Sequence, residues 1–170
     1  MDLRSIIRTI PDFPEKGVMF RDISTVLQNG EALRAAVDKV VDSVKNIDFD
    51  LVIGPESRGF IFGVPAAYAL NKGFVPVRKA GKLPFATVKK SYSLEYGTAE
   101  LEIHTDAVKK GQRVVIIDDL LATGGTSRAI AELVEEVGGK VAKMSFLIEL
   151  EALGGRGLLG GYDVYSVVKY

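Results

Sequence analysis

The stretch VVIIDDLLATGGT, from Val114 to Thr126, contains the signals that decide the fold of this chain. Its four leading apolar residues predict a buried strand, residues 118–125 predict a turn, and Thr126 opens a helical pattern. In an open parallel sheet, ligands bind beyond the carboxyl ends of the strands, where a helix N-terminus offers backbone N–H groups to an anion. The stretch therefore predicts an anion-binding turn between a buried strand and a helix.

The residue types in this turn suit a sugar phosphate. Two glycines let the backbone approach phosphate oxygens closely, and two threonine hydroxyls add donors. Adjacent carboxylates disfavour a phosphate, but they suit the vicinal hydroxyls of a sugar and a nearby divalent metal. The turn residues are Ala122, Thr123, Gly124, Gly125 and Thr126, and the carboxylates are Asp118 and Asp119.

Strand and helix patterns alternate on both sides of this stretch. An apolar stripe from Leu33 to Val44 predicts a helix of about four turns. Further helices are predicted over residues 57–70 and 126–137, and strands over residues 50–54, 74–78, 113–118, 141–148 and 162–168. Because the strand segments are short, rich in β-branched residues and mostly apolar throughout, we expect an α/β fold whose central, mostly parallel sheet is covered by helices on both faces.

Two segments depart from the alternation. At the N-terminus, apolar spacing predicts a short helix from Leu3 to Ile10, ended by Pro11, and then an ordered loop over residues 11–23. Between Lys79 and Gly111 we expect a long polar loop and a half-exposed strand over residues 99–104, with Glu102 on its polar side, paired in a hairpin with residues 91–96. A loop of this length is expected to be functional, mobile or both.

Composition restricts the possible functions. The chain has 170 residues, enough for one ordinary domain, and 47% of them are hydrophobic. Twenty-two basic residues balance 22 acidic ones, so composition gives no indication of nucleic-acid or anionic-membrane binding. The sequence has no cysteine, which excludes disulfides and thiolate chemistry. Without a signal-peptide pattern or a run of about 18 apolar residues, a cytoplasmic protein is expected.

Two other phosphate-binding motifs do not fit. The P-loop pattern G-x-x-x-x-G-K-[ST] is missing from the sequence. Residues 155–160, GRGLLG, match the letters of the dinucleotide-binding pattern G-x-G-x-x-G. That pattern requires a following helix and an acidic residue about 20 residues further on, and neither follows here. We therefore interpret residues 155–160 as a glycine-rich loop before the last strand.

The 13 residues from Val114 to Thr126 resemble the signature of type I phosphoribosyltransferases. Four further segments, DFPEKGVMFRDIS, GPESRGFIFG, VRKAGKLP and SYSLEYGTAELEIH, resemble the adenine phosphoribosyltransferase family in order and spacing. The segments span nearly the whole chain. The resemblance implies a single domain over residues 1–170, with an N-terminal hood at residues 1–25 and a flexible catalytic loop and hairpin at residues 79–104.

The resemblance also implies a reaction, in which adenine and phosphoribosyl pyrophosphate give AMP and pyrophosphate in purine salvage. Asp118 and Asp119 would hold the ribose hydroxyls, and residues 122–126 would hold the 5′-phosphate. Mg²⁺ would arrive with the substrate and lie near the two aspartates, without a tight protein site. The family is usually homodimeric, so a homodimer is expected.

Further side chains receive roles from the same resemblance. The backbone at Met19 and Arg21 would read the edge of the adenine, while Phe20 and Leu120 would sandwich its faces. Positive charges would stabilise the departing pyrophosphate, and they belong to Arg58, Arg78, Lys79 and Lys82. The peptide bond between Glu56 and Ser57 would be cis.

Glu95 is the expected acid–base residue. Substitution at an anomeric carbon passes through an oxocarbenium-like state, and the incoming base nitrogen must lose a proton. A carboxylate on a closing loop serves both needs, and Arg58 is expected to assist catalysis beside it.

Two other functions stay open at this stage. A sister enzyme could use xanthine, hypoxanthine or another base on the same phosphate-binding turn. A regulator could sense phosphoribosyl pyrophosphate without catalysis, although such regulators carry an additional DNA-binding domain for which this sequence has no spare residues.

Overall fold

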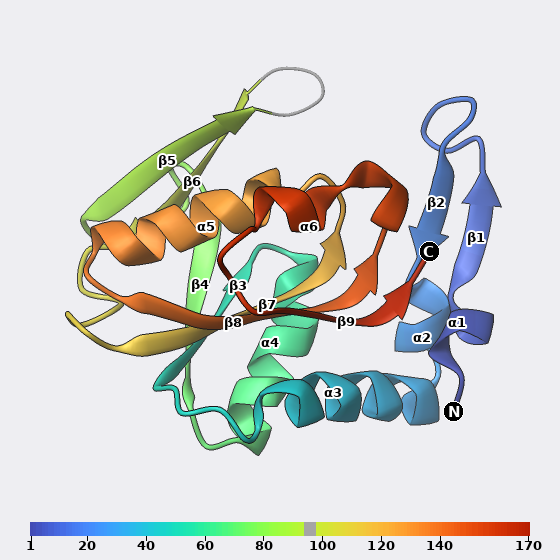
Figure 1. Ribbon diagram of the computed structural model, residues 1–170, viewed down its shortest axis with the longest axis horizontal. Helices are drawn as coiled ribbons and strands as arrows, with labels where there is room; N and C mark the ends of the chain where they lie inside the picture. Colours follow the sequence, from blue (N-terminus) through green and yellow to red (C-terminus); the bar gives the residue numbers. More distant parts are fainter. Residues whose placement is uncertain (94–97) are drawn as a thin grey trace.

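The computed structural model describes residues 1–93 and 98–170, and its centre is a seven-stranded sheet (Figure 1). The strand order is β5-β6-β4-β3-β7-β8-β9. The strands are β3 (Leu51–Pro55), β4 (Gly73–Lys79), β5 (Thr87–Ser93), β6 (Thr98–His104), β7 (Arg113–Leu121), β8 (Lys140–Glu149) and β9 (Val164–Lys169). Strands β4, β3, β7, β8 and β9 are parallel, and the β5–β6 hairpin adds to β4 in antiparallel fashion. The predicted mostly parallel sheet is confirmed.

Helices cover both faces of this sheet. The helices α3 (Gly30–Val44) and α4 (Arg58–Ala69) lie on one face, and α5 (Gly125–Glu136) lies on the other (Figure 1). The predicted helix over residues 33–44 is therefore confirmed, and it begins slightly earlier because the Asn29 side chain accepts hydrogen bonds from the first-turn N–H groups.

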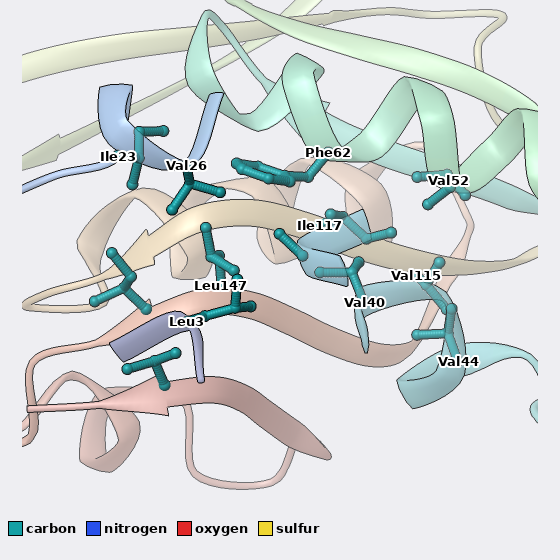
Figure 2. Packing of buried hydrophobic residues seen from close by; sticks show 14 of the residues in the cluster. Leu3, Ile23, Val26, Val40, Val44, Val52, Phe62, Val115, Ile117 and Leu147 are labelled. Atoms are coloured by element: carbon teal, nitrogen blue, oxygen red, sulfur yellow. The ribbon is translucent and has the colours of Figure 1, made fainter. Parts of the chain in front are cut away.

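Strand β7 connects the two hydrophobic cores. Its side chains alternate, so Val115 and Ile117 pack with Phe62 and Val40 beneath the sheet (Figure 2). The alternate residues Val114 and Ile116 belong to the second core, which lies between the sheet and α5. All four β7 side chains are fully buried. A strand buried on both faces reads as a continuous apolar run, which explains why the sequence signal of β7 was clear.

The N-terminal prediction was partly wrong. The helix α1 covers only Leu3–Ile6, and a two-stranded antiparallel sheet of β1 (Arg8–Pro11) and β2 (Met19–Asp22) follows, before the short helix α2 (Ser24–Leu27). Ile10 precedes Pro11, and a residue before proline disfavours helical backbone. Pairing with residues further along the chain then favours the strand, since Pro11 lies opposite Met19 and Ile10 opposite Phe20.

The hairpin prediction was right in kind but placed its first strand too late. Strand β5 begins at Thr87, opposite His104, and the pairing continues to Ser93 opposite Thr98. The expected polar loop is therefore shorter, and β5 and β6 project from the sheet as a long hairpin (Figure 1).

The glycine-rich segment near the C-terminus is not simply a loop. A 3₁₀ turn, Glu151–Leu153, leads into the single-turn helix α6 (Gly155–Leu158). Gly154 adopts a left-handed backbone conformation between them, with φ of 67°.

No helix in the described residues combines the length and apolar character that crossing a membrane requires.

Truncating a core residue of α5 tests this packing. Leu133 lies on the buried face of α5 and is fully buried. Leu133→Ala is therefore expected to lower the free energy of unfolding by about 2–5 kcal/mol through lost burial and an unfilled cavity. Urea denaturation measures the change. Glu136→Ala, an exposed position on the same helix, should stay within about 0.5 kcal/mol of wild type. Equal effects at the two positions would contradict the assigned face of α5.

Candidate active site

A cavity of about 410 Å³ lies at the carboxyl ends of β3 and β7. Strand β3 ends at Pro55 and leads into α4, while β7 ends at Leu121 and leads through a turn into α5. Because these parallel strands are neighbours, both strand-to-helix turns open at the same edge of the sheet. The residues around the cavity include Glu56, Ser57, Arg58, Lys79, Tyr92, Leu101 and the continuous run from Asp118 to Ser127.

The cavity brings together most of the residues singled out from the sequence. Arg58, Lys79 and Leu120 line it with Asp118, Asp119 and the whole turn from Ala122 to Thr126. Arg78 and Lys82 instead lie beside it, where both contact Glu56. The hood residues Met19, Phe20 and Arg21 belong to β2 and are not among the residues that line this cavity. Glu95 lies outside the described residues.

Two adjacent carboxylates lie at the end of β7. Asp118 and Asp119 are 8% and 5% exposed, and the Asp118 Oδ1 accepts a hydrogen bond of 2.8 Å from the Asp119 N–H. Burial, reinforced by the charge of Asp119, raises the pKa of Asp118 well above its ordinary value. Burial also raises the pKa of Asp119, and the Arg58 guanidinium, whose Nε lies 2.8 Å from Asp119 Oδ2, opposes that rise.

The turn after these aspartates presents backbone to the cavity. Gly124 has φ of 86°, a left-handed conformation that glycine adopts without a steric penalty. Helix α5 begins at the next residue, so the N–H groups of its first turn are directed toward the turn. The Thr126 hydroxyl lies 3.3 Å from the Tyr92 hydroxyl, which ties the turn to the β5–β6 hairpin. This arrangement can bind an anion through backbone and hydroxyl donors.

The loop after β4 is held by two carboxylates that the sequence interpretation did not use. Glu56 accepts hydrogen bonds from the Lys79 N–H at 2.6 Å and the Lys82 ammonium at 3.0 Å. Burial would raise the pKa of Glu56, but the Lys79 N–H and the cations of Lys82 and Arg78 outweigh it and lower the pKa to about 2. The peptide bond from Glu56 to Ser57 is cis, as the resemblance implied.

Glu102 is the second of these carboxylates, and its expected exposure was wrong. Glu102 is 1% exposed, and its Oε1 accepts hydrogen bonds from the N–H groups of Lys82 at 2.9 Å and Leu83 at 2.8 Å. Burial alone would raise the pKa of Glu102, but hydrogen bonds from the backbone of residues 81–83 lower it. The alternation of β6 was correct, but Glu102 on its polar side faces the loop, whereas Glu100 on the same side is exposed.

The hood contacts Tyr170, the residue that follows the last strand. The Arg21 guanidinium lies 3.8 Å from the centre of the Tyr170 ring and donates a hydrogen bond to the Thr9 hydroxyl. The ring of Phe20 packs edge-on against Phe13, with centroids 5.1 Å apart. Residues distant in sequence thus fix the hood, and no local pattern could have indicated the contact with Tyr170.

Comparison with known proteins gives first the class of protein. Residues 22–156 match the family described as "Phosphoribosyl transferase domain". The match covers most of the chain and includes the turn, the two aspartates and Arg58. Together with the sheet topology it defines a protein of the phosphoribosyltransferase class.

Full-length relatives narrow this class. The chain is 61% identical to an adenine phosphoribosyltransferase of Agathobacter rectalis, over 99% of this chain and 97% of that protein. The crystal structure of an adenine phosphoribosyltransferase from Thermoanaerobacter pseudethanolicus is 53% identical, with a TM-score of 0.96 and coverage of 99% and 98% of the two chains. That of the Saccharomyces cerevisiae enzyme, complexed with adenine and an imino-altritol bisphosphate, is 37% identical, with a TM-score of 0.91 and coverage of 98% and 96%. The chain therefore belongs to the adenine phosphoribosyltransferase family.

Glu56→Gln tests whether the charge of Glu56 stabilises the loop after β4. A carboxylate whose folded-state pKa is lowered stabilises the protein above its ordinary pKa, and this contribution is lost as the pH falls through the folded-state value. For Glu56 the ordinary value is 4.5 and the folded-state value is about 2. The wild type should therefore exceed the variant in free energy of unfolding at neutral pH, and the difference should shrink steadily from about pH 5 down to about pH 2.

Urea denaturation at several pH values measures this difference. Glu136→Gln, which changes an exposed carboxylate, should give a small difference that is the same at each pH. A wild-type advantage over Glu56→Gln that persists undiminished in acid would rule out the charge of Glu56 as its source.

Proposed function

We propose that the protein transfers the 5-phosphoribosyl group of phosphoribosyl pyrophosphate to adenine, giving AMP and pyrophosphate. The observation that carries the proposal is the cavity in which Arg58, Asp119 and the turn from Ala122 to Thr126 meet. This cavity places a cation next to carboxylates that can bind sugar hydroxyls and to backbone N–H groups that can bind a phosphate. Full-length similarity to adenine phosphoribosyltransferases supports adenine as the acceptor base.

In this proposal the substrate lies along the carboxyl edge of β3 and β7. The turn from Ala122 to Thr126 binds the 5′-phosphate, and Asp118 and Asp119 accept hydrogen bonds from the ribose hydroxyls. Leu120 and Phe20 contact the two faces of adenine, and the backbone at Met19 and Arg21 reads its edge. Residues 1–25 act as the hood, and residues 79–104 as the catalytic loop and hairpin, of a single domain over residues 1–170.

The chemistry replaces one bond at the anomeric carbon by another. The bond to the pyrophosphate oxygen breaks, the bond to the adenine nitrogen forms, and that nitrogen passes its proton to the carboxylate of Glu95, the proposed base. Negative charge develops on the leaving group, and positive groups already fixed near it lower the barrier. Those groups are Arg58, Arg78, Lys79 and Lys82. The Lys79 N–H and the Lys82 ammonium donate hydrogen bonds to Glu56, which hold both residues in place.

Mg²⁺ is the proposed cofactor. Among the described residues, no group of three or more potential ligands forms a metal site. The paired carboxylates at the end of β7 supply the oxygen donors that Mg²⁺ prefers. Burial and then the charge of Asp119 raise the pKa of Asp118, and a cation beside the pair would oppose both effects. These residues fit an ion held mainly by the substrate. When bound, Mg²⁺ would neutralise charge on the pyrophosphate. Homodimer formation and a cytoplasmic location remain predictions.

One assay tests the choice of base. The purified protein is incubated with Mg²⁺, phosphoribosyl pyrophosphate and a mixture of adenine, hypoxanthine, guanine, xanthine, uracil and orotate, and the nucleotide products are identified. We expect AMP alone. Another nucleotide would indicate a sister enzyme, and tight binding of phosphoribosyl pyrophosphate without turnover would indicate a regulator.

Glu95→Gln tests the proposed acid–base residue. General acid–base catalysis contributes about 10²–10⁴-fold, so kcat should fall by about a hundredfold or more, while the affinity for phosphoribosyl pyrophosphate changes little. Steady-state kinetics and calorimetry measure the two quantities. Glu100→Gln, a substitution of an exposed acid on the same hairpin, should keep wild-type kcat. If Glu95→Gln also kept it, Glu95 would have no such role.

A further inference from the structure

The glycine-rich segment Gly154–Gly157 packs directly on the turn that follows β7. A Cβ placed on Gly155 would lie 2.2 Å from the Ala122 carbonyl oxygen and 2.9 Å from the Gly124 nitrogen. Conversely, a Cβ on Gly124 would lie 2.6 Å from the Gly155 carbonyl oxygen. Neither side has room for a side chain, so the two backbones are in contact. The position of Gly155 therefore determines where the turn can lie.

Gly155 in turn is placed by its neighbour, Arg156. The Arg156 guanidinium donates to both carboxylate oxygens of Glu149, at 2.9 and 2.5 Å, and to the Val164 carbonyl oxygen at 2.7 Å. The Ser166 hydroxyl completes the network with a 2.6 Å bond to Glu149. The Glu149 side chain is 4% exposed, and the hydrogen bond from Arg156 is the main cause that lowers its pKa. A buried carboxylate kept charged in this way fixes the guanidinium in one orientation.

The same network is connected to the strand that carries the site. Glu149 is the last residue of β8 and lies opposite Leu121, the last residue of β7. The Leu150 N–H donates to the Leu121 carbonyl oxygen at 2.9 Å. The network of Arg156 and Glu149 therefore reaches the turn by two routes. One runs through the pairing of β8 with β7, and the other runs through Gly155.

We propose that Arg156 is a positioning residue for the phosphate-binding turn, acting through Gly155 on the backbone of residues 122–124. The inference rests on the proposed function, in which this turn binds the 5′-phosphate. Without the bidentate pair, Gly155 can move away and the turn loses its support. The consequence is weaker binding of the sugar phosphate, with little effect on the base, whose proposed contacts are the hood and Leu120 and so lie outside residues 122–124.

The test compares two variants that disturb the turn by different routes. Arg156→Gln removes the charged pair, and Gly155→Ala keeps it but pushes on the Ala122 carbonyl. For each, calorimetry gives the dissociation constant of ribose 5-phosphate, and kinetics give kcat and the KM values of phosphoribosyl pyrophosphate and adenine. In both variants we expect the ribose 5-phosphate dissociation constant and the KM of phosphoribosyl pyrophosphate to rise about tenfold or more, while the KM of adenine stays within about twofold.

Lys169→Gln is the matched control. Its ammonium contacts Glu151 at 3.0 Å and the same Glu149 oxygen at 4.0 Å, but Lys169 is not part of the segment that packs on the turn. It should leave all four quantities unchanged. Arg156→Lys keeps a cation without the planar fork and should give an intermediate loss. It takes the place of Arg156→Gln if that variant does not fold.

The outcomes separate this inference from the proposed function. A wild-type protein that forms no AMP and does not bind ribose 5-phosphate would overturn the proposed function. A wild type that does both, with Arg156 variants that are less stable to heat but bind ribose 5-phosphate normally, would overturn the inference and leave the pair a purely structural role. Equal losses for the sugar phosphate and for adenine would overturn it as well.

Discussion

The ion pair between Arg58 and Asp119 is the interaction on which the arrangement of the site depends. Two adjacent carboxylates at the end of a buried strand repel each other and lose hydration, and both effects raise the pKa of Asp118. A cation close by makes such an arrangement tolerable. Arg58 can provide it because β3 and β7 are neighbours and α4 begins immediately beyond β3. The order of the strands thus places the cation that opposes the rise in the pKa of Asp119.

The same balance of charge extends outward from this pair. Glu56 accepts the N–H of Lys79, the last residue of β4, and Glu102 accepts the N–H groups of Lys82 and Leu83 in the loop that follows. Hydrogen bonds from backbone groups lower the pKa of a carboxylate and also fix the position of the donor chain. The cations of Arg78 and Lys82 are held in place by Glu56 in the same way. The sheet itself contributes little polarity, but it sets the distances between these groups.

Much of the fold followed from local patterns. Strand β7 and helix α3 were predictable because one is apolar throughout and the other has an apolar stripe at helical spacing, and both patterns match the buried surfaces found. Strand β1 was not predictable, because Ile10 and Thr9 fit the end of a helical pattern and only pairing with β2 decides for a strand. Burial of Glu102 was missed for a related reason: alternation identifies the polar side of β6 but not what covers it.

The amino-acid sequence alone was enough to indicate the class of ligand, because the turn residues and the two aspartates are contiguous and their chemistry is local. The tertiary structure decided what surrounds them. Arg58 reaches Asp119, and Tyr92 and Gly155 reach the turn, from three separate segments, and these contacts depend on strand order and helix packing. Contacts between residues far apart in sequence leave no periodic pattern in it. For that reason GRGLLG had no evident purpose in the sequence, and its contact with the turn emerged only when β8 was placed beside β7 and β9 beside β8.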